Sequence, residues 1–253
     1  MLCYHNLGGN GVPFENFSDQ MRWLKAKGVR SLSLEDVKEY MRGERIKGPK
    51  VLITFDDGFR DIYTRAAPLL KELGFQATVF MITSRIRPEH EPGQEDDIVS
   101  DEAHEHYVLT GKRAAWLSRG EIREMLHDGV IELGSHSVRH RKYRVSKPRL
   151  SEIPYHWAYA PYRQLGETPV PVLAPELAGP ICRGESPSCY KETTEQFSFR
   201  VEQELRQSRE ALEALSGGPI TAMAWPWGAY CRAGQRAAQA AGFELLFTTK
   251  RGA

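Results

Sequence analysis

The stretch Val51-Leu52-Ile53-Thr54-Phe55-Asp56-Asp57-Gly58 constrains the fold more than any other part of the chain. Its first five residues are apolar or β-branched, which predicts a buried strand. The strand then stops at two adjacent carboxylates and a glycine. Neighbouring carboxylates repel each other, and folds accept this where a cation or a proton-transfer reaction offsets the cost. A plain Asp-Asp-Gly turn is the alternative, because Asp and Gly are common turn residues.

Length and composition allow one large domain. The chain has 253 residues, of which 41% are hydrophobic, so it can bury a real core. Thirty-four basic residues against 33 acidic ones leave a formal charge of +1. Nucleic acids and anionic membranes both favour a basic excess, so we expect neither as a partner. No apolar run approaches the roughly 20 residues that cross a bilayer.

The first residues of the chain, 1–5, resemble a strand already in progress and not a signal peptide. They lack a basic region, a long apolar run and a small-residue cleavage site. We therefore expect either a cytosolic protein or a trimmed piece of a longer chain. The four cysteines are too few for a disulfide scaffold, although Cys182 and Cys189 lie in one loop and can close a small ring.

Apolar periodicity and turn residues predict alternating strands and helices. Besides the opening strand, we expect strands at 29–32, 50–55, 76–82, 130–134, 220–225 and 243–248, with helices at 14–27, 33–43, 60–73, 118–127, 196–215 and 230–241. Pro68 lies inside one helical stretch and predicts a kink or a restart there. This order favours parallel pairing and a single α/β domain of about seven strands.

Two segments interrupt this alternation. Residues 85–115 are acidic and contain His90, His104 and His106. We interpret them as a solvated surface insertion and not as a metal site, because blocks of charge usually face water. Residues 146–195 carry eight prolines and an aromatic cluster and are expected to be loop-like. They are either a lid or a substrate-facing wall.

Four expected strand ends carry groups suited to chemistry. They are His5, the pair Asp56-Asp57, the pair His136 and His140, and the pair Trp225 and Trp227. In parallel α/β folds, reactive groups gather at the carboxyl ends of strands. Histidines four apart on a helical turn face the same side. Two imidazoles and a carboxylate suit a divalent metal such as zinc, although two surface histidines in a loop remain an alternative.

Two of these segments resemble the motifs of one protein family. Thr54-Phe55-Asp56-Asp57-Gly58, followed by His136-Ser137-Val138-Arg139-His140, resembles the TFDDG and H-S/T-x-x-H motifs of the polysaccharide deacetylases, which share the NodB homology domain and form carbohydrate esterase family 4. Ala224-Trp225-Pro226-Trp227-Gly228 with Tyr230 resembles the branch that acts on poly-β-1,6-N-acetylglucosamine. The resemblance implies a distorted (β/α)7-type barrel over residues 1–253, with insertions near 85–115 and 146–195.

The resemblance also implies roles for individual residues. Asp57, His136 and His140 would bind a divalent metal, with Zn²⁺ the first choice and Co²⁺, Ni²⁺ or Fe²⁺ as alternatives. Asp56 would take the proton of the attacking water. The backbone N–H of Phe59 would stabilise the oxyanion. Residues expected to contact the polysaccharide are Phe59, Trp225, Pro226, Trp227 and Tyr230. The products would be acetate and a glucosamine unit.

The chain departs from the family pattern in two places. Its third motif lacks the arginine that orients the catalytic aspartate, for which Arg163 is a weak substitute. A late Leu-x-His motif, which supplies the general acid, is also missing, so the acid is either His5 or a residue beyond Ala253. A chitin-oligosaccharide or peptidoglycan deacetylase and a catalytically weak carbohydrate-binding relative therefore stay open. The family largely works outside the cytoplasm, which favours an extracytoplasmic protein whose export segment is absent from this chain.

Overall fold

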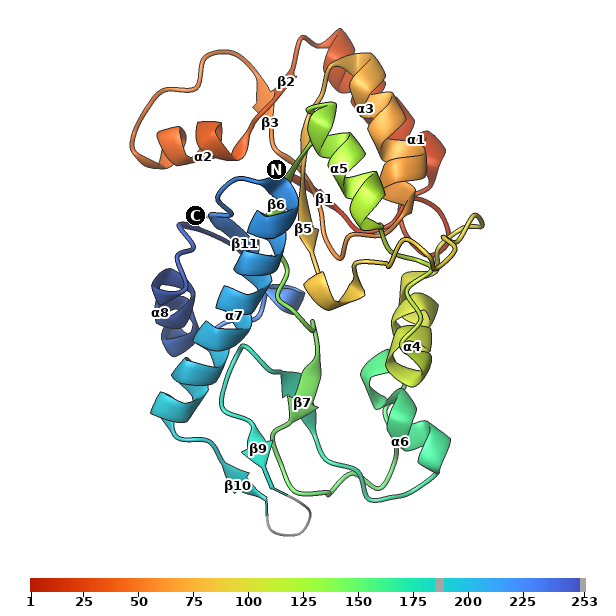
Figure 1. Cartoon of the computed structure of the whole chain (residues 1–253), viewed down its shortest axis with the longest axis vertical. Coiled ribbons are helices and arrows are strands. Elements are labelled where there is room, and N and C mark those ends of the chain that lie inside the picture. Colours follow the sequence, from red (N-terminus) through yellow and green to blue (C-terminus); the bar gives the residue numbers. More distant parts are fainter. Residues whose placement is uncertain (185–188, 251–253) are drawn as a thin grey trace.

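The computed structural model describes residues 1–184 and 189–250, and a parallel six-stranded sheet forms its centre (Figure 1). In spatial order, the strands are β1 (Leu2–Tyr4), β4 (Ile53–Phe55), β5 (Ala77–Met81), β6 (Ile131–Ser135), β11 (Ala222–Ala224) and β12 (Leu245–Phe247). Every pairing between them is parallel, so all six carboxyl ends lie at one edge of the sheet. The sheet is curled into a half-barrel, which confirms the expected α/β fold.

Helices cover the sheet and make its core. They are α1 (Phe14–Ala26), α3 (Ala67–Leu73), α5 (Arg119–His127), α7 (Thr194–Ser216) and α8 (Arg232–Ala240), while α2 (Leu34–Met41) lies apart at the upper left of Figure 1. All five residues of β5 are buried, as expected for a central parallel strand covered on both faces. One continuous apolar cluster joins the inner faces of these helices to the sheet.

Local sequence signals account for several element boundaries. Ser33 and Ser118 each form a capping box, with Asp36 and Glu121 respectively, and so begin α2 and α5 as their spacing predicts. The interruption expected at Pro68 is present, because a π-helical turn (Ile62–Ala66) precedes α3 and the proline lies in the first turn of that helix.

The expected seventh strand does not join the sheet. Residues 29–32 contain β2 (Arg30–Ser31), which pairs with β3 (Lys50–Val51) in a separate two-stranded sheet. The stretch 50–55 is therefore divided, and only β4 enters the main sheet. Both residues of β2 are at least partly exposed, so this strand lacks the apolar faces that a central position requires.

The two insertions are more ordered than the sequence predicts. Residues 85–115 contain α4 (Ser100–Thr110), preceded by the short 3₁₀ helix η2 (Thr83–Arg85). The segment 146–195 was expected to be loop-like, and this is wrong in its described part. It holds η3 (Trp157–Tyr159), α6 (Ala160–Leu165), β8 (Leu173–Pro175), β9 (Cys182–Arg183) and β10 (Tyr190–Lys191), with β7 (Lys142–Arg144) just before it. Pro161 fits because it occupies the first turn of α6.

Residues 185–188 of the second insertion lie outside the described part. The nearby Cys182 and Cys189 are both free thiols.

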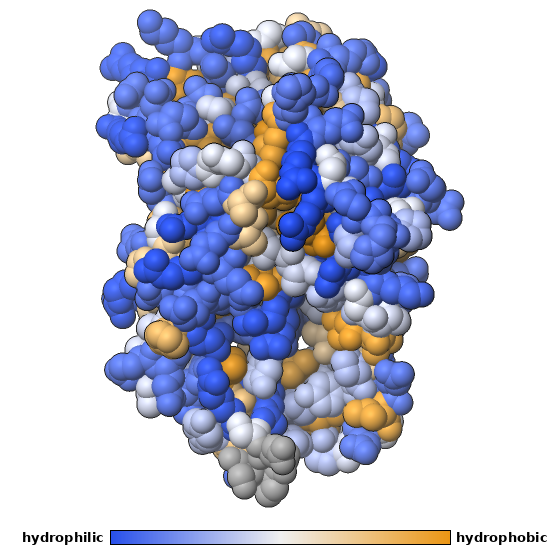
Figure 2. Space-filling view, viewed as in Figure 1, coloured by the Kyte–Doolittle hydropathy of each residue, from blue (hydrophilic) through white to orange (hydrophobic). Residues whose placement is uncertain are grey.

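The face of the molecule seen in Figure 2 is mostly hydrophilic, with short apolar stretches among charged side chains. Among the described residues, no helix has both the length and the apolar character needed to cross a membrane.

A buried carboxylate joins the loop after β1 to the segment after β4. Asp61 is 4% exposed, and its Oδ2 accepts a hydrogen bond of 2.6 Å from the backbone N–H of Leu7. Burial raises the pKa of Asp61 to about 7, although the N–H of Leu7 and the nearby Arg65 oppose the shift. The folded protein therefore binds a proton at Asp61 that the unfolded chain has already lost between pH 4 and 7.

We expect this proton to make stability depend on pH. The contribution of Asp61 to the free energy of unfolding should fall by up to about 4 kcal/mol as the pH rises from about 4 to about 7, and stay constant above that. Asp61→Asn keeps an acceptor for Leu7 but does not titrate, so it should gain stability relative to the native chain over this range. Urea unfolding at a series of pH values measures the difference. For the exposed control Asp19→Asn, the difference in free energy of unfolding from the native chain should not change with pH. The same result for Asp61→Asn would contradict a raised pKa at Asp61.

Candidate metal centre

Side chains from neighbouring strand ends meet at the carboxyl edge of the sheet. Asp57 follows β4, and His136 follows β6. These two strands are the neighbours of β5 on either side, so their carboxyl ends lie on the two sides of the carboxyl end of β5. The convergence inferred from the sequence is therefore present in the structure.

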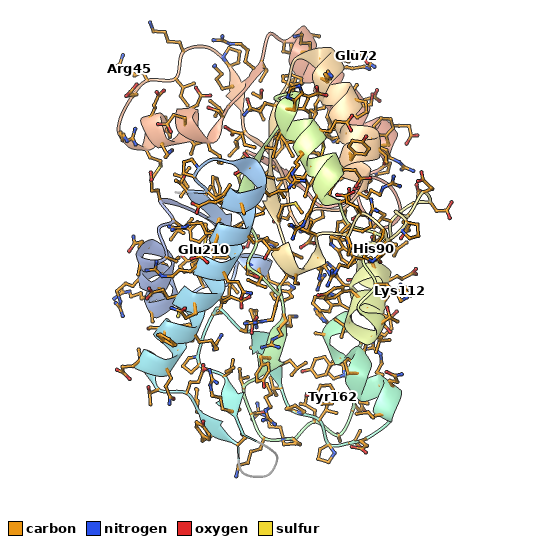
Figure 3. All side chains as sticks on the ribbon, viewed as in Figure 1. Arg45, Glu72, His90, Lys112, Tyr162 and Glu210 are labelled. Atoms are coloured by element: carbon orange, nitrogen blue, oxygen red, sulfur yellow. The ribbon has the colours of Figure 1, made fainter. Side chains whose placement is uncertain are left out.

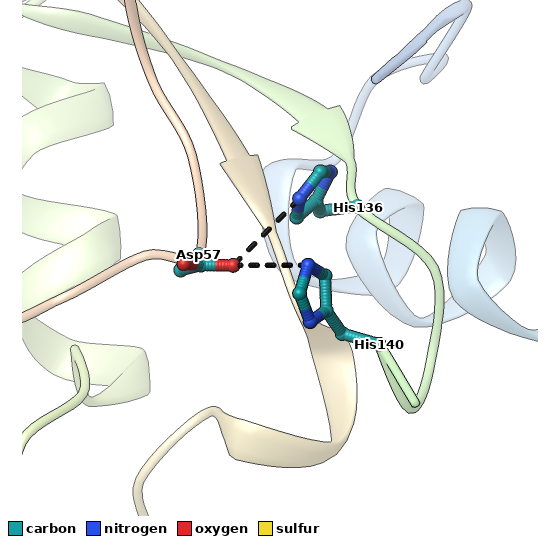
Figure 4. A group of neighbouring side chains, drawn as sticks. All are labelled: Asp57, His136 and His140. Carbon is teal, nitrogen blue, oxygen red and sulfur yellow. Dashed lines mark ion pairs between the residues drawn. The ribbon is translucent and has the colours of Figure 1, made fainter. Parts of the chain in front are cut away.

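Asp57, His136 and His140 form a compact and buried group (Figure 4). Asp57 Oδ1 lies 3.7 Å from His136 Nε2 and 3.5 Å from His140 Nε2. These separations are too long for strong hydrogen bonds, and Oδ1 has no hydrogen-bond partner in the described part of the chain. The three ligand atoms lie within 4.8 Å of one another, which is the spacing of donors around a shared cation.

The protonation of the two histidines fits a metal site. His136 Nδ1 is 2.9 Å from the carbonyl oxygen of Ala224, the last residue of β11. A carbonyl only accepts, so Nδ1 carries a proton, and in the neutral imidazole the lone pair of Nε2 faces Asp57. Burial lowers the pKa of His140 well below its usual value, which keeps that imidazole neutral. Two neutral imidazoles and a carboxylate are a ligand set for Zn²⁺ and for Co²⁺, Ni²⁺ or Fe²⁺.

The segment 136–140 is a tight turn and not the helical turn that the spacing suggested. Ser137 and His140 have positive φ angles of 69° and 45°. Ser137 Oγ accepts from the N–H of His140 at 3.0 Å, and Ser135 Oγ accepts from the N–H of Ser137 at 3.1 Å. The two imidazoles reach the same side because this hydroxyl-bonded turn reverses the chain between them.

Helix α7 fixes this turn through hydrogen bonds from two of its side chains. Glu204 Oε1 accepts from the N–H groups of Val138 and Arg139 at 3.2 and 3.1 Å, and the Arg139 guanidinium pairs with the same carboxylate. One turn later on α7, Ser208 Oγ lies 2.7 Å from Ser135 Oγ. The histidine turn is thereby fixed to the longest helix of the protein (Figure 1).

Backbone strain gathers at this site. Four non-glycine residues in the described chain have positive φ: Asp57, Ser137, His140 and Trp227. All four belong to the segments that form the metal centre. Gly58, the residue after Asp57, also has a φ of 74°, and a Cβ there would lie 2.5 Å from the side chain of Met81. Strained conformations persist where the surrounding structure enforces them, and they cluster at functional sites.

Asp56, the expected base, is half-buried beside the metal centre. Burial raises the pKa of its carboxyl group, while His136 and His5 oppose the shift. The thiol of Cys3 lies 3.7 Å from Asp56 Oδ2. Burial and the Asp56 carboxylate raise the pKa of this thiol to about 12, so it remains a proton donor toward Asp56.

The arginine suggested for Asp56 lies elsewhere. Arg163 pairs with Glu105 at 2.6 Å and donates to the carbonyl groups of Pro154 and His156. His5, the candidate acid, is exposed and directly follows β1.

The expected substrate contacts divide into two groups. The ring of Trp227 lies 4.2 Å from His140 and 5.9 Å from Trp157, so it lies at the metal ligands. Trp225 and Pro226 are buried, Trp225 in the main apolar core, and the ring of the half-buried Tyr230 lies 6.1 Å from that of Trp225. The side chain of Phe59 is fully buried. Its backbone N–H binds no acceptor within the described ranges.

The structure adds residues that the sequence interpretation missed. His104 Nε2 lies 3.3 Å from Asp57 Oδ2, and the ring is 4% exposed. The interpretation of 85–115 as a solvated surface insertion is therefore wrong for His104. It holds for His90 and His106, which are exposed, and Figure 3 shows His90 near one end of α4. The histidine pattern alone gave no signal that separates the three.

Arg85 was also missed. Its guanidinium is 1% exposed and lies over the rings of Tyr107, Trp116 and Trp157 at 4.7, 5.0 and 5.4 Å. Burial lowers its pKa to about 10, so it remains charged, and its charge helps to lower the pKa of Asp57. A sequence signal existed here, because Arg85 follows closely after the carboxyl end of β5.

Comparison with known proteins decides the family. The family model described as polysaccharide deacetylase matches residues 43–246. The chain belongs to the polysaccharide deacetylase family. This confirms the resemblance drawn from the two motifs, which both lie inside the matched region.

Curated relatives match about half of this chain. The Bacillus subtilis protein YxkH, assigned to the same family, is 31% identical over 144 residues, which are 55% of this chain and 42% of that protein. The poly-β-1,6-N-acetyl-D-glucosamine N-deacetylase of Staphylococcus aureus is 28% identical over 142 residues, 56% of this chain and 41% of that protein. The match thus spans less than half the length of each relative.

A solved structure supports the fold of the chain. The BpsB deacetylase domain of Bordetella bronchiseptica superposes with a TM-score of 0.67 at 23% identity, over 93% of this chain and 77% of that one. This similarity extends over both insertions and confirms the NodB-like barrel architecture.

The contacts of Glu204 on α7 with Val138 and Arg139 can be tested for their effect on stability. Glu204→Ala leaves two backbone N–H groups without their acceptor and removes the ion pair with the 37% exposed Arg139 side chain. We expect a loss of about 2–4 kcal/mol in the free energy of unfolding, measured with urea. The control Glu202→Ala removes an exposed i,i+4 pair with Arg206 on the same helix and should cost less than about 1 kcal/mol. Equal losses in the free energy of unfolding for the two variants would show that Glu204 does not stabilise the histidine turn.

Proposed function

We propose that this chain hydrolyses N-acetyl groups of an N-acetylglucosamine-containing polysaccharide in a metal-dependent reaction. The observation that carries the proposal is the buried group of Asp57, His136 and His140 beside a second carboxylate, Asp56. Membership of the polysaccharide deacetylase family supports the reaction class. The relative from Staphylococcus aureus favours poly-β-1,6-N-acetylglucosamine as the polymer. Such a substrate places the reaction outside the cytoplasm.

Asp57, His136 and His140 would hold the metal, for which Zn²⁺ is the first candidate. When bound, a divalent ion polarises an amide carbonyl and lowers the pKa of a water ligand from about 15.7 toward about 7. The burial of all three ligands excludes bulk water from this position and strengthens their electrostatic attraction for a cation.

Asp56 and His5 would move the protons. Burial raises the pKa of Asp56, which makes its carboxylate a better proton acceptor than an exposed aspartate. Asp56 would take a proton as water adds to the amide carbon. The C–N bond then breaks, and the leaving amine takes a proton from His5. The products are acetate and a glucosamine unit.

The oxyanion and the sugar would meet groups on two sides of the site. The N–H of Phe59, which binds no acceptor among the described residues, would be a donor for the developing oxyanion, and Gly58 allows the tight turn before it. The ring of Trp227 offers a face for a sugar. A cavity of about 590 Å³ lies along α4, and Tyr155, His156 and Trp157 line part of it. The ring of Trp157 lies 5.9 Å from that of Trp227. These residues favour the interpretation of 146–195 as a substrate-facing wall.

Two substitutions separate metal binding from turnover. Asp57→Ala removes a ligand, so we expect it to lose both bound metal and acetate release. Asp56→Asn leaves the ligands intact, so we expect normal metal content with turnover reduced by about 10²–10⁴-fold. Metal analysis of the purified protein and an acetate assay measure the two properties. Retention of metal and activity in Asp57→Ala would refute the metal centre, and full activity in Asp56→Asn would refute the base.

The polymer is tested by direct comparison. We expect faster acetate release from poly-β-1,6-N-acetylglucosamine than from chitin oligosaccharides or peptidoglycan, at equal acetyl concentration and with added Zn²⁺ or Co²⁺. A preference for either of the other two would change the substrate assignment. Binding of oligosaccharide without acetate release would favour a catalytically weak binding protein. The supporting observation is that, among residues 1–184 and 189–250, no arginine acts on the Asp56 carboxylate.

A further inference from the structure

The carboxylate of Asp57 faces different partners with its two oxygens. Oδ1 faces His136 and His140, at 3.7 and 3.5 Å. Oδ2 faces His104 Nε2, at 3.3 Å. In the described part of the chain, His104 makes the one hydrogen bond to this carboxylate. The hydrogen bond from His104 to Oδ2 therefore fixes the orientation of the carboxylate and leaves Oδ1 directed toward His136 and His140.

The hydrogen bond has a defined direction. A carboxylate that is ionised only accepts, so His104 Nε2 must carry the proton. Its Nδ1 is buried and has no partner within the described residues, so no competing acceptor draws the proton to the other nitrogen. His104 thus acts as a donor to Asp57. It is not part of the compact group of Asp57, His136 and His140, and it contacts Oδ2 of the carboxylate where the other two imidazoles face Oδ1.

Aromatic rings hold the imidazole of His104 in place. It stacks on Trp157 at 4.8 Å with an interplanar angle of 20°, and on His140 at 5.6 Å and 10°. Phe59 and Trp116 meet it at 5.5 and 5.7 Å. A ring packed on several sides keeps one orientation, so the donor stays aimed at Asp57.

The helix that carries His104 is itself anchored beside the site. Tyr107, three residues later on the same face of α4, donates to Ser84 Oγ at 3.2 Å and lies under the Arg85 guanidinium. Ser84 and Arg85 belong to η2, which follows β5. The insertion 85–115 is thus joined to the carboxyl edge of the sheet at two points, a ligand contact and a structural contact.

We propose that His104 is a positioning residue of the metal centre, which orients Asp57 Oδ1 toward His136 and His140 and so raises metal affinity. The inference rests on the metal centre proposed above. Partners that orient a ligand typically change metal affinity by about 10–100-fold when they are removed. The insertion then has a function in assembling the ligand set, in addition to lining the cavity.

Metal affinity of three variants tests the proposal. His104→Phe keeps the aromatic stacking and removes the donor, so the Kd for Zn²⁺ in a chelator competition should rise by about 10–100-fold. His104→Gln places an N–H donor at a similar reach and should restore most of the affinity. His90→Phe, an exposed position in the same insertion, is the matched control and should bind as the native chain does. The visible spectrum of the Co²⁺-loaded protein should shift for His104→Phe and not for His90→Phe.

The outcomes separate this inference from the function on which it rests. Native affinity and an unshifted Co²⁺ spectrum in His104→Phe, while Asp57→Ala loses the metal, would overturn the role of His104 and leave the metal centre intact. Absence of metal binding in the native chain would overturn the metal centre itself. Thermal unfolding with a chelator present checks that each variant folds. If His104→Phe does not fold, His104→Leu replaces it in the same comparison, and equal affinities of the Leu and Gln variants would overturn the proposal.

Discussion

The structure depends on how a buried negative charge is stabilised at one edge of the sheet. Asp57 is 3% exposed, and burying an ionised carboxylate is costly unless charge and hydrogen bonds compensate it. Burial opposes its ionisation, while the surrounding histidines and the charged Arg85 hold its pKa below the usual value. One oxygen still lacks a hydrogen-bond partner among the described residues. A cation at that position would complete the balance, which is the physical basis for the metal centre.

The rigidity of the centre comes from elements that are distant in sequence. The parallel sheet aligns the ends of β4 and β6, and the carbonyl group of Ala224 on β11 sets the tautomer of His136. Helix α7 then fixes the histidine turn through Glu204 and Ser208. Three strand ends and one helix thus determine the orientation of two imidazoles. This explains how the histidine turn is kept in a strained conformation, because contacts from α7 and β11 add to the hydrogen bonds within the turn.

The two insertions enclose the site from the side opposite the sheet. His104 and Tyr107 of α4 and Trp157 of η3 surround the Arg85 guanidinium and the outer face of Asp57. Aromatic rings suit this position because they stabilise a buried cation without a counter-carboxylate. A carboxylate in the same place would compete with Asp57 for the metal. The cavity along α4 opens next to this aromatic wall, so the same residues border the metal centre and the proposed polysaccharide surface.

The sequence by itself determined the features that depend on local patterns. The strand ending at Asp56-Asp57, the histidine pair, the capped starts of α2 and α5, and the interruption near Pro68 all follow from neighbouring residues, and the family follows from two short motifs. Only the tertiary structure decided which of three histidines in the insertion is buried, that Arg85 lies beside Asp57, and that residues 136–140 form a turn held by α7. Those features depend on contacts between segments far apart in the chain, such as His104 with Asp57 across 47 residues. Local periodicity carries no record of such contacts, because burial is set by the packing of whole elements.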